Sequence, residues 1–120
     1  MNDRSSPENI VTISKPRGEA FALRQTVYNR DGTVPDLSGC TAIDLVAVRN
    51  MEDKAADALY TKALGDFTIS GADNNIATCN IARGEDNYHG DVFILTRFTI
   101  SATKSVVTIF KLFNLNTRAV

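Results

Sequence analysis

Apolar and polar residues alternate with a period of two along most of the chain. From Glu19 to Tyr28, Phe21, Leu23 and Val27 share one face, with Gln25 as the polar exception on it. This period predicts a strand, because successive side chains of a strand point to opposite faces. Similar short segments recur at intervals of about ten residues, which is typical of all-β domains. They span residues 10–13, 40–49, 58–64, 67–70, 76–82, 92–102 and 105–115.

Turn-forming residues separate these segments. We expect turns or connections at 15–18, 29–32, 71–75 and 103–104, where Gly, Pro, Asn or Asp gather. The segment 50–57 has too thin an apolar side for a packed helix, so it predicts a loop with at most one helical turn. A parallel sheet needs long crossovers, for which there is no room. The pattern therefore predicts an all-β, antiparallel immunoglobulin-like β-sandwich of seven to eight strands.

The predicted domain organisation is simple. Residues 1–8 are polar and form an N-terminal arm, 9–115 form the β-sandwich domain, and 116–120 form a C-terminal tail. The arm has no apolar residue beyond Met1, so it cannot become ordered by burial, and we expect it to be ordered only in an assembly. A chain of 120 residues fits one such domain.

Composition excludes several classes of partner. Thirty of the 120 residues are Val, Ile or Thr, which favours strands. The formal net charge of −1 argues against nucleic acid and anionic membranes, which demand a basic excess. No stretch is long and apolar enough to span a membrane, and the first residues lack the apolar region of a signal peptide. We expect a protein that is made in the cytoplasm and binds neither nucleic acid nor membrane.

Few side chains are available to bind a metal or a cofactor. With Cys40, Cys79 and one histidine there are too few ligands for structural zinc, and the cysteines are expected to be small buried side chains, although a disulfide stays open. The segments 73–75 and 85–87 offer oxygen ligands that suit Ca²⁺, but such residues are also the usual turn formers, which is the interpretation we favour. No glycine-rich phosphate loop is present. We predict no cofactor and no metal.

Catalysis has one candidate centre. His89 follows Glu85 and Asp86, so the three could form an acid–base site, whereas the simpler interpretation is a solvated polar loop. We favour the loop and predict no catalytic residue and no enzymatic activity. The basic residues Lys15, Arg17, Arg24 and Arg30 are expected to be ordinary solvated surface.

The last two predicted strands are apolar on both faces. In 92–102, one face carries Val92, Ile94, Phe98 and Ile100, and the other carries Phe93 and Leu95 beside Arg97 and Thr99. A strand that is buried on one side is normally polar on its opposite side. Either a partner covers the second face, or loops, the arm or a bulge account for it. The side chains predicted to form an interface are Phe93, Leu95, Ile109 and Phe113.

Several segments together resemble a known family. Residues 16–21 followed by 28–41 resemble the opening of the small β-sandwich domains of tailed-bacteriophage virion proteins, of which the N-terminal domains of baseplate upper proteins are an example. The similarity continues through Arg49, which ends a strand, and through 65–69, 76–81 and 90–93. It covers nearly the whole chain from Ile10 onward. The chain departs from the pattern at Glu19, where aspartate is usual, and at 91–93, where a glycine–tyrosine start is more common.

The resemblance implies a structural role. It predicts a non-enzymatic virion protein that docks onto other virion proteins, including copies of itself, in the tail or baseplate. An alternative is a carbohydrate-binding module for host surface glycans. Such sites use aromatic platforms, and this chain has no Trp and three Tyr residues, of which Tyr88 is the candidate contact.

Overall fold

The computed structural model describes residues 11–118, and within that range the chain is all-β with no α-helix. Residues 1–10 and 119–120 lie outside the described range. The predicted N-terminal arm, 1–8, and the last two residues of the predicted C-terminal tail, 116–120, therefore lie outside it. Eight strands are described. They are β1 (Val11–Arg17), β2 (Phe21–Thr26), β3 (Ala42–Val48), β4 (Tyr60–Ala63), β5 (Phe67–Ser70), β6 (Ile76–Ile81), β7 (Gly90–Ser101) and β8 (Lys104–Arg118).

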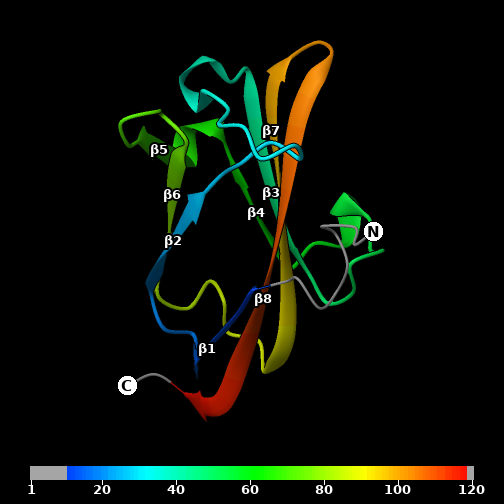
Figure 1. Cartoon of the computed structure of the whole chain (residues 1–120). Helices are drawn as coiled ribbons and strands as arrows, with labels where there is room; N and C mark the ends of the chain where they lie inside the picture. The colour runs from blue at the N-terminus through cyan, green and yellow to red at the C-terminus, as the bar shows by residue number, and fades with distance from the viewer. Residues whose placement is uncertain (1–10, 119–120) are drawn as a thin grey trace.

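The strands form two sheets that pack against each other (Figure 1). The larger sheet has the order β1-β8-β7-β3-β4, and the smaller has the order β2-β6-β5. Long strands β7 and β8 run along most of the molecule, with the smaller sheet facing them (Figure 1). The described helical segments are the three short 3₁₀ turns Leu37–Gly39, Ala55–Asp57 and Leu64–Asp66. No helix among the described residues is long and apolar enough to cross a membrane.

One pair of strands departs from the expected antiparallel arrangement. β1 lies parallel to β8, so the larger sheet is mixed, whereas the other described pairs are antiparallel. The alternation within a strand predicts which side chains share a face, but it carries no information on the direction of the neighbouring strand. β1 lies at the edge of the larger sheet, where β8 is its neighbour.

β1 is also longer than the sequence predicted. Pro16 and Arg17 were assigned to a turn, yet both belong to the strand. Proline lacks an N–H group and is therefore confined to edge strands and bulges. β1 is an edge strand, and its register with β8 shifts between Pro16 and Arg17. The turn follows at Gly18, whose φ of +79° is a conformation that favours glycine.

The core lies between the two sheets. Leu23 of β2 packs in one cluster with residues of the larger sheet, including Leu45, Ile94 and Leu112. A second cluster contains Phe98, whose ring meets Phe67 edge to face at 6.2 Å between centroids. Burial of such side chains supplies the main favourable free energy of folding.

Gln25, the polar exception on the inner face of β2, is fully buried. Its Nε2 donates a hydrogen bond to Thr96 Oγ1 (3.2 Å), and its Oε1 accepts one from Thr108 Oγ1. These bonds join the smaller sheet to β7 and β8 and meet the requirement that a buried amide be hydrogen-bonded.

Candidate interaction surface

The two faces of β7 differ in burial as the alternation predicts. Val92, Ile94 and Phe98 are fully buried, whereas Ile100, predicted on the same face, is half-buried next to the irregularity in the ladder between Thr99 and Ser101. Phe93 and Leu95 point to the opposite side of the sheet and are half-buried. Replacing Phe93 or Leu95 therefore changes the outer face of the larger sheet and leaves the core between the sheets intact.

Strand pairing brings some of the predicted interface residues together. Leu95 and Ile109 are directly opposite each other in the β7–β8 ladder, and Phe93 lies one outward position away from Leu95. Paired residues in a ladder share a face, so these three side chains form a continuous apolar group. Phe113 is on the same face but pairs with Asp91, four residues along β8 from Ile109. At about 3.4 Å per residue this separation is about 14 Å.

An ion pair between Lys111 and Asp91 interrupts the apolar side chains of this face. Lys111 lies between Ile109 and Phe113 on the outer face of β8, and its Nζ is 3.5 Å from Asp91 Oδ2. Both charges are partly solvated, so the pair contributes little to stability. It leaves this part of the face electrically neutral, because the two charges cancel.

The most exposed apolar side chains of the face are on β8. Val107 is 50% exposed, Phe113 40% and Leu115 41%. Val107 and Leu115 were not among the predicted interface residues, although the alternation along 105–115 places them on the same face. The exposure of a side chain depends on the strands beside it. On the edge of the sheet, β8 has β1 as its neighbour, and the described pairing with β1 begins only at Phe110. We call the set Val107, Ile109, Phe113 and Leu115, together with Phe93 and Leu95, the outer apolar row.

The row ends near β3. Val46 pairs with Leu95 and is half-buried, whereas Val48 pairs with Phe93 and is fully buried. The β3–β4 connection contacts β3 through its 3₁₀ turn Ala55–Asp57. Part of the outer face is thus covered by the chain itself, and the exposed part lies over β8.

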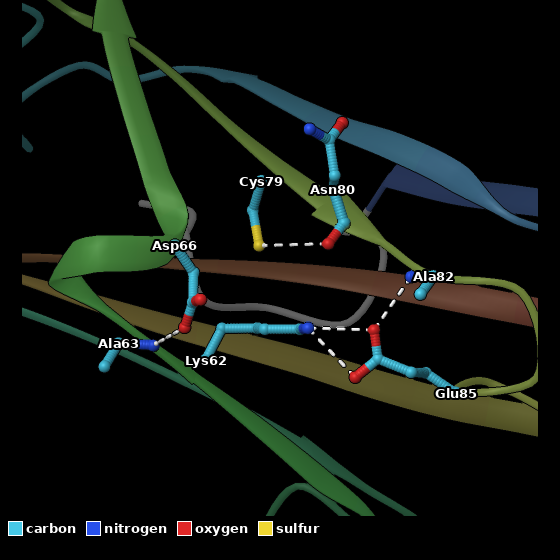
Figure 2. A network of polar contacts seen from close by, with 7 residues as sticks. All are labelled: Lys62, Ala63, Asp66, Cys79, Asn80, Ala82 and Glu85. Atoms are coloured by element: carbon cyan, nitrogen blue, oxygen red, sulfur yellow. Dashed lines mark hydrogen bonds and ion pairs between the residues drawn. The ribbon is translucent and has the colours of Figure 1, made fainter.

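The candidate acid–base residues do not assemble into a site. His89 is exposed, and its backbone oxygen accepts a hydrogen bond from Arg49 Nη1 (2.7 Å). Glu85 is engaged by Lys62, whose Nζ lies 2.9 Å from both carboxylate oxygens (Figure 2). Asp86 is buried and contacts Lys15.

Glu85 anchors the β6–β7 loop instead. Besides Lys62, its Oε1 accepts a hydrogen bond from the Ala82 N–H at 2.8 Å (Figure 2). The hydrogen bonds from Lys62 and then from Ala82 hold the pKa of Glu85 below its ordinary value. A carboxylate that is stabilised in this way is a poor general base, because it binds a proton weakly.

The oxygen-rich segments considered for Ca²⁺ have other partners. Asn75 is buried and its Nδ2 donates to the Val27 carbonyl oxygen (3.1 Å), and Asn74 adopts a φ of +54° within the β5–β6 turn. No group of three or more His, Cys, Asp or Glu side chains capable of holding a metal is found between residues 11 and 118. Both cysteines are free, and burial raises the pKa of each thiol.

Sequence reasoning missed one buried polar cluster. Lys15 was assigned to solvated surface, yet its side chain is only 7% exposed and its Nζ lies 2.8 Å from Asp86 Oδ2. Asn114 of β8 is fully buried beside them, and its Nδ2 donates to the same oxygen at 3.0 Å. The signal in the sequence is an Asn that follows Val106, Phe110 and Leu112 on the inward face of β8, but an Asn alone does not show which residues it would contact.

Comparison with known proteins gives no relative. No family model, no curated protein and no solved structure matches this chain.

Proposed function

We propose that the chain is a structural, non-enzymatic protein of a tailed-phage particle. It docks onto a neighbouring virion protein in the tail or baseplate through the outer apolar row. The proposal starts from the family resemblance of residues 16–21 and 28–41, and the exposed side chains of β8 supply the surface that such a role needs.

The proposal includes an immunoglobulin-like strand arrangement. In variable-type domains of that fold, strands G, F, C and C′ lie in one sheet, and B, E and D lie in the facing sheet. β8-β7-β3-β4 and β2-β6-β5 have the same order of sequence positions. The chain changes sheets between β1 and β2, β2 and β3, β4 and β5, and β6 and β7, and the last three changes correspond to those between B and C, C′ and D, and E and F. This agreement in connectivity supports the assignment.

The observation that carries the docking proposal is the exposure of Val107, Phe113 and Leu115 on one strand face. These three side chains would lose water contact against a partner, and burial of apolar surface contributes about 25 cal/mol per Å². On this face Arg97 is the ladder partner of both Val107 and Asp44, so Arg97 and Asp44, like Lys111 and Asp91, bring one charge of each sign and no net charge. The face therefore fits a neutral, apolar patch on another protein better than a charged polymer.

Mass analysis of purified particles tests the proposal. The chain is expected among the particle proteins in a fixed ratio to the other tail or baseplate components. Its absence from purified particles would rule the proposal out. Detection of the chain in a free, monomeric pool together with particles that lack it would have the same meaning.

The carbohydrate-binding alternative lacks a supporting aromatic platform. Tyr88 has its ring 5.8 Å from the Arg49 guanidinium and its hydroxyl donating to the Leu59 carbonyl oxygen (3.4 Å), so both parts are engaged. The Tyr60 hydroxyl is buried, and Tyr28 is the tyrosine with large exposure, at 52%. Glycan-array binding that is lost on Tyr28→Ala would favour this alternative.

A further inference from the structure

Lys15 and Asn114 are held side by side by the strand pairing. β1 and β8 are parallel neighbours, and these two residues are ladder partners. Adjacent strands are about 4.8 Å apart, and paired side chains project to the same face. Both side chains are buried on the inner face of the larger sheet, Lys15 at 7% exposure and Asn114 at 0%.

Asp86 brings the two side chains to a common point. Its Oδ2 lies 2.8 Å from Lys15 Nζ and accepts a hydrogen bond from Asn114 Nδ2 at 3.0 Å. The Asn114 amide is oriented by a second bond, since Nδ2 also donates to the Tyr88 carbonyl oxygen (2.7 Å). The amine and the carboxamide are therefore both within hydrogen-bonding reach of one carboxylate oxygen.

The loop that carries Asp86 is fixed on both sides. The Gly18 N–H donates to the Asp86 carbonyl oxygen (2.9 Å), and the Gly84 N–H donates to the Gly18 carbonyl oxygen (2.9 Å). The neighbouring Glu85 is held by Lys62 (Figure 2). A carboxylate that is held in this way is pre-positioned and needs no rearrangement to act on its neighbours.

The Lys15–Asp86 pair is shielded from water. Lys15 Nζ is 4.9 Å from the centre of the Phe21 ring, a cation–π contact, and Asp86 is fully buried. Taking charges out of water is costly, even for a pair. One proton transfer along the 2.8 Å contact would convert the ion pair into a neutral amine and a carboxylic acid. A neutral, desolvated lysine amine is a nucleophile.

Buried oxygen atoms without hydrogen-bond partners also support a proton transfer within this cluster. Within the part of the chain that the structure describes, Tyr60 Oη, Asp86 Oδ1 and Asn114 Oδ1 are buried and lack a hydrogen-bond partner. Of these only the Tyr60 hydroxyl can donate, and it lies near Asp86, since burial and then the Asp86 charge raise the pKa of Tyr60. One hydroxyl cannot satisfy both acceptors, and a proton on the Asp86 carboxyl would supply a second donor and polarise the Asn114 carbonyl toward attack.

We propose that Lys15 and Asn114 form an intramolecular amide cross-link, with Asp86 as the catalytic residue. Lys15 Nζ attacks Asn114 Cγ and a new N–C bond forms. Asp86 takes a proton from the attacking nitrogen and gives one to the leaving nitrogen, so it ends in its starting state. The Cγ–Nδ2 bond breaks and one ammonia leaves. No oxidant, metal or second substrate is needed.

The cross-link would join the first described strand to the last. A pull applied outside residues 15 and 114 would then pass through a covalent bond, and the strands between them would carry no load. This inference stands on the buried cluster alone and does not depend on the outer apolar row.

Intact-mass analysis of the folded, purified protein tests the inference. We expect the wild-type mass to be lower than the mass calculated from the sequence by one ammonia, about 17 Da. Digestion should give a branched peptide that joins the segments containing Lys15 and Asn114. Wild-type protein at its full calculated mass would overturn the inference, as would loss of ammonia with linear peptides only.

Variants separate the roles of the three residues. Lys15→Arg and Asn114→Ala should each have the full calculated mass. Asp86→Asn keeps the shape of the carboxyl group but cannot carry the proton, so it should also have the full mass, with circular dichroism showing retained strands. Lys111→Arg is the matched control, because it alters another lysine ion pair of the same sheet. It should keep the loss of ammonia.

Two results would contradict the assigned chemistry. A loss of one water, about 18 Da, with a branch between Lys15 and Asp86 would make Asp86 the electrophile instead of the catalyst. Persistence of the cross-link in a folded Asp86→Asn variant would remove Asp86 from the reaction.

Discussion

At the scale of single residues, burial separates side chains that stabilise the fold from those available to a partner. Phe98 is fully buried and packs against Phe67, whereas Phe113 on the neighbouring strand is 40% exposed. The two phenylalanines are chemically identical, so replacing each by alanine measures the effect of position alone.

Phe98→Ala is expected to destabilise the protein by about 3–5 kcal/mol, because it removes a buried ring and leaves a cavity. Phe113→Ala should change the free energy of unfolding by about 0.5 kcal/mol or less, as is usual for surface substitutions. Urea denaturation followed by circular dichroism measures both. Equal losses for the two variants would show that the faces of the hairpin are assigned wrongly.

Glu85 gives a pH-dependent prediction at the same scale. Its pKa is lowered in the folded protein by Lys62 and the Ala82 N–H, so its contribution to stability is complete above the unfolded-state value near 4.5. The contribution is lost as the pH falls through the lower folded-state pKa. It should be small, about 0.2–1 kcal/mol, because the pair is partly solvated.

The difference in free energy of unfolding between wild type and Glu85→Gln isolates this contribution. It should favour the wild type at neutral pH and shrink toward zero in acid below 4.5. Other carboxylates titrate in both proteins and cancel in the difference. A difference that stays constant with pH would mean that the Glu85–Lys62 pair does not contribute.

At the scale of the elements, alternation predicted where strands lie and which face of each is buried. It succeeded for β7, since Val92, Ile94 and Phe98 are buried as a set. It failed for Lys15, because a lysine in a turn-like sequence gives no sign of the buried carboxylate that receives it. Asp86 is 71 positions away in sequence, and only the folded chain brings the two together.

Alternation did not predict whether neighbouring strands run parallel or antiparallel, or which segments cover the outer face of a sheet. The parallel pairing of β1 with β8 and the burial of Val48 both depend on segments distant in sequence. Local periodicity describes one strand at a time, so it cannot show which element covers an outer face. The predicted interface residues lie on the outer face of the larger sheet, and Val107 and Leu115, which were not among them, lie on the same face.

Glycines test the turns that join the elements. Gly71 has a φ of +92°, and a Cβ there would lie 3.0 Å from Ile76 Cδ1. Gly71→Ala should destabilise the protein by about 1–3 kcal/mol because the backbone conformation is strained for other residues. Gly65→Ala is the matched control, since a Cβ at that position meets nothing within 4 Å. Thermal unfolding measures both, and a Gly71→Ala variant as stable as Gly65→Ala would contradict the turn geometry.

At the scale of the whole molecule, two sheets enclose one core and leave the outer face of β8 apolar. Soluble proteins seldom expose contiguous apolar surface without a binding role. Because the inner and outer faces are distinct, an outer-face variant should separate assembly from folding. Val107→Ser with Phe113→Ser removes two exposed side chains of the outer apolar row. Val34→Ser removes a similarly exposed side chain, 43% exposed, from a loop, and serves as the control.

Incorporation of these variants into particles is the most direct measurement of the proposed role. The Val107→Ser, Phe113→Ser variant should unfold cooperatively near the wild-type midpoint and yet be depleted from purified particles at least about tenfold, as a loss of about 1.4 kcal/mol in docking free energy would produce. Val34→Ser should be incorporated like the wild type. A folded double variant that is incorporated at the wild-type level would contradict docking through the outer face of β8.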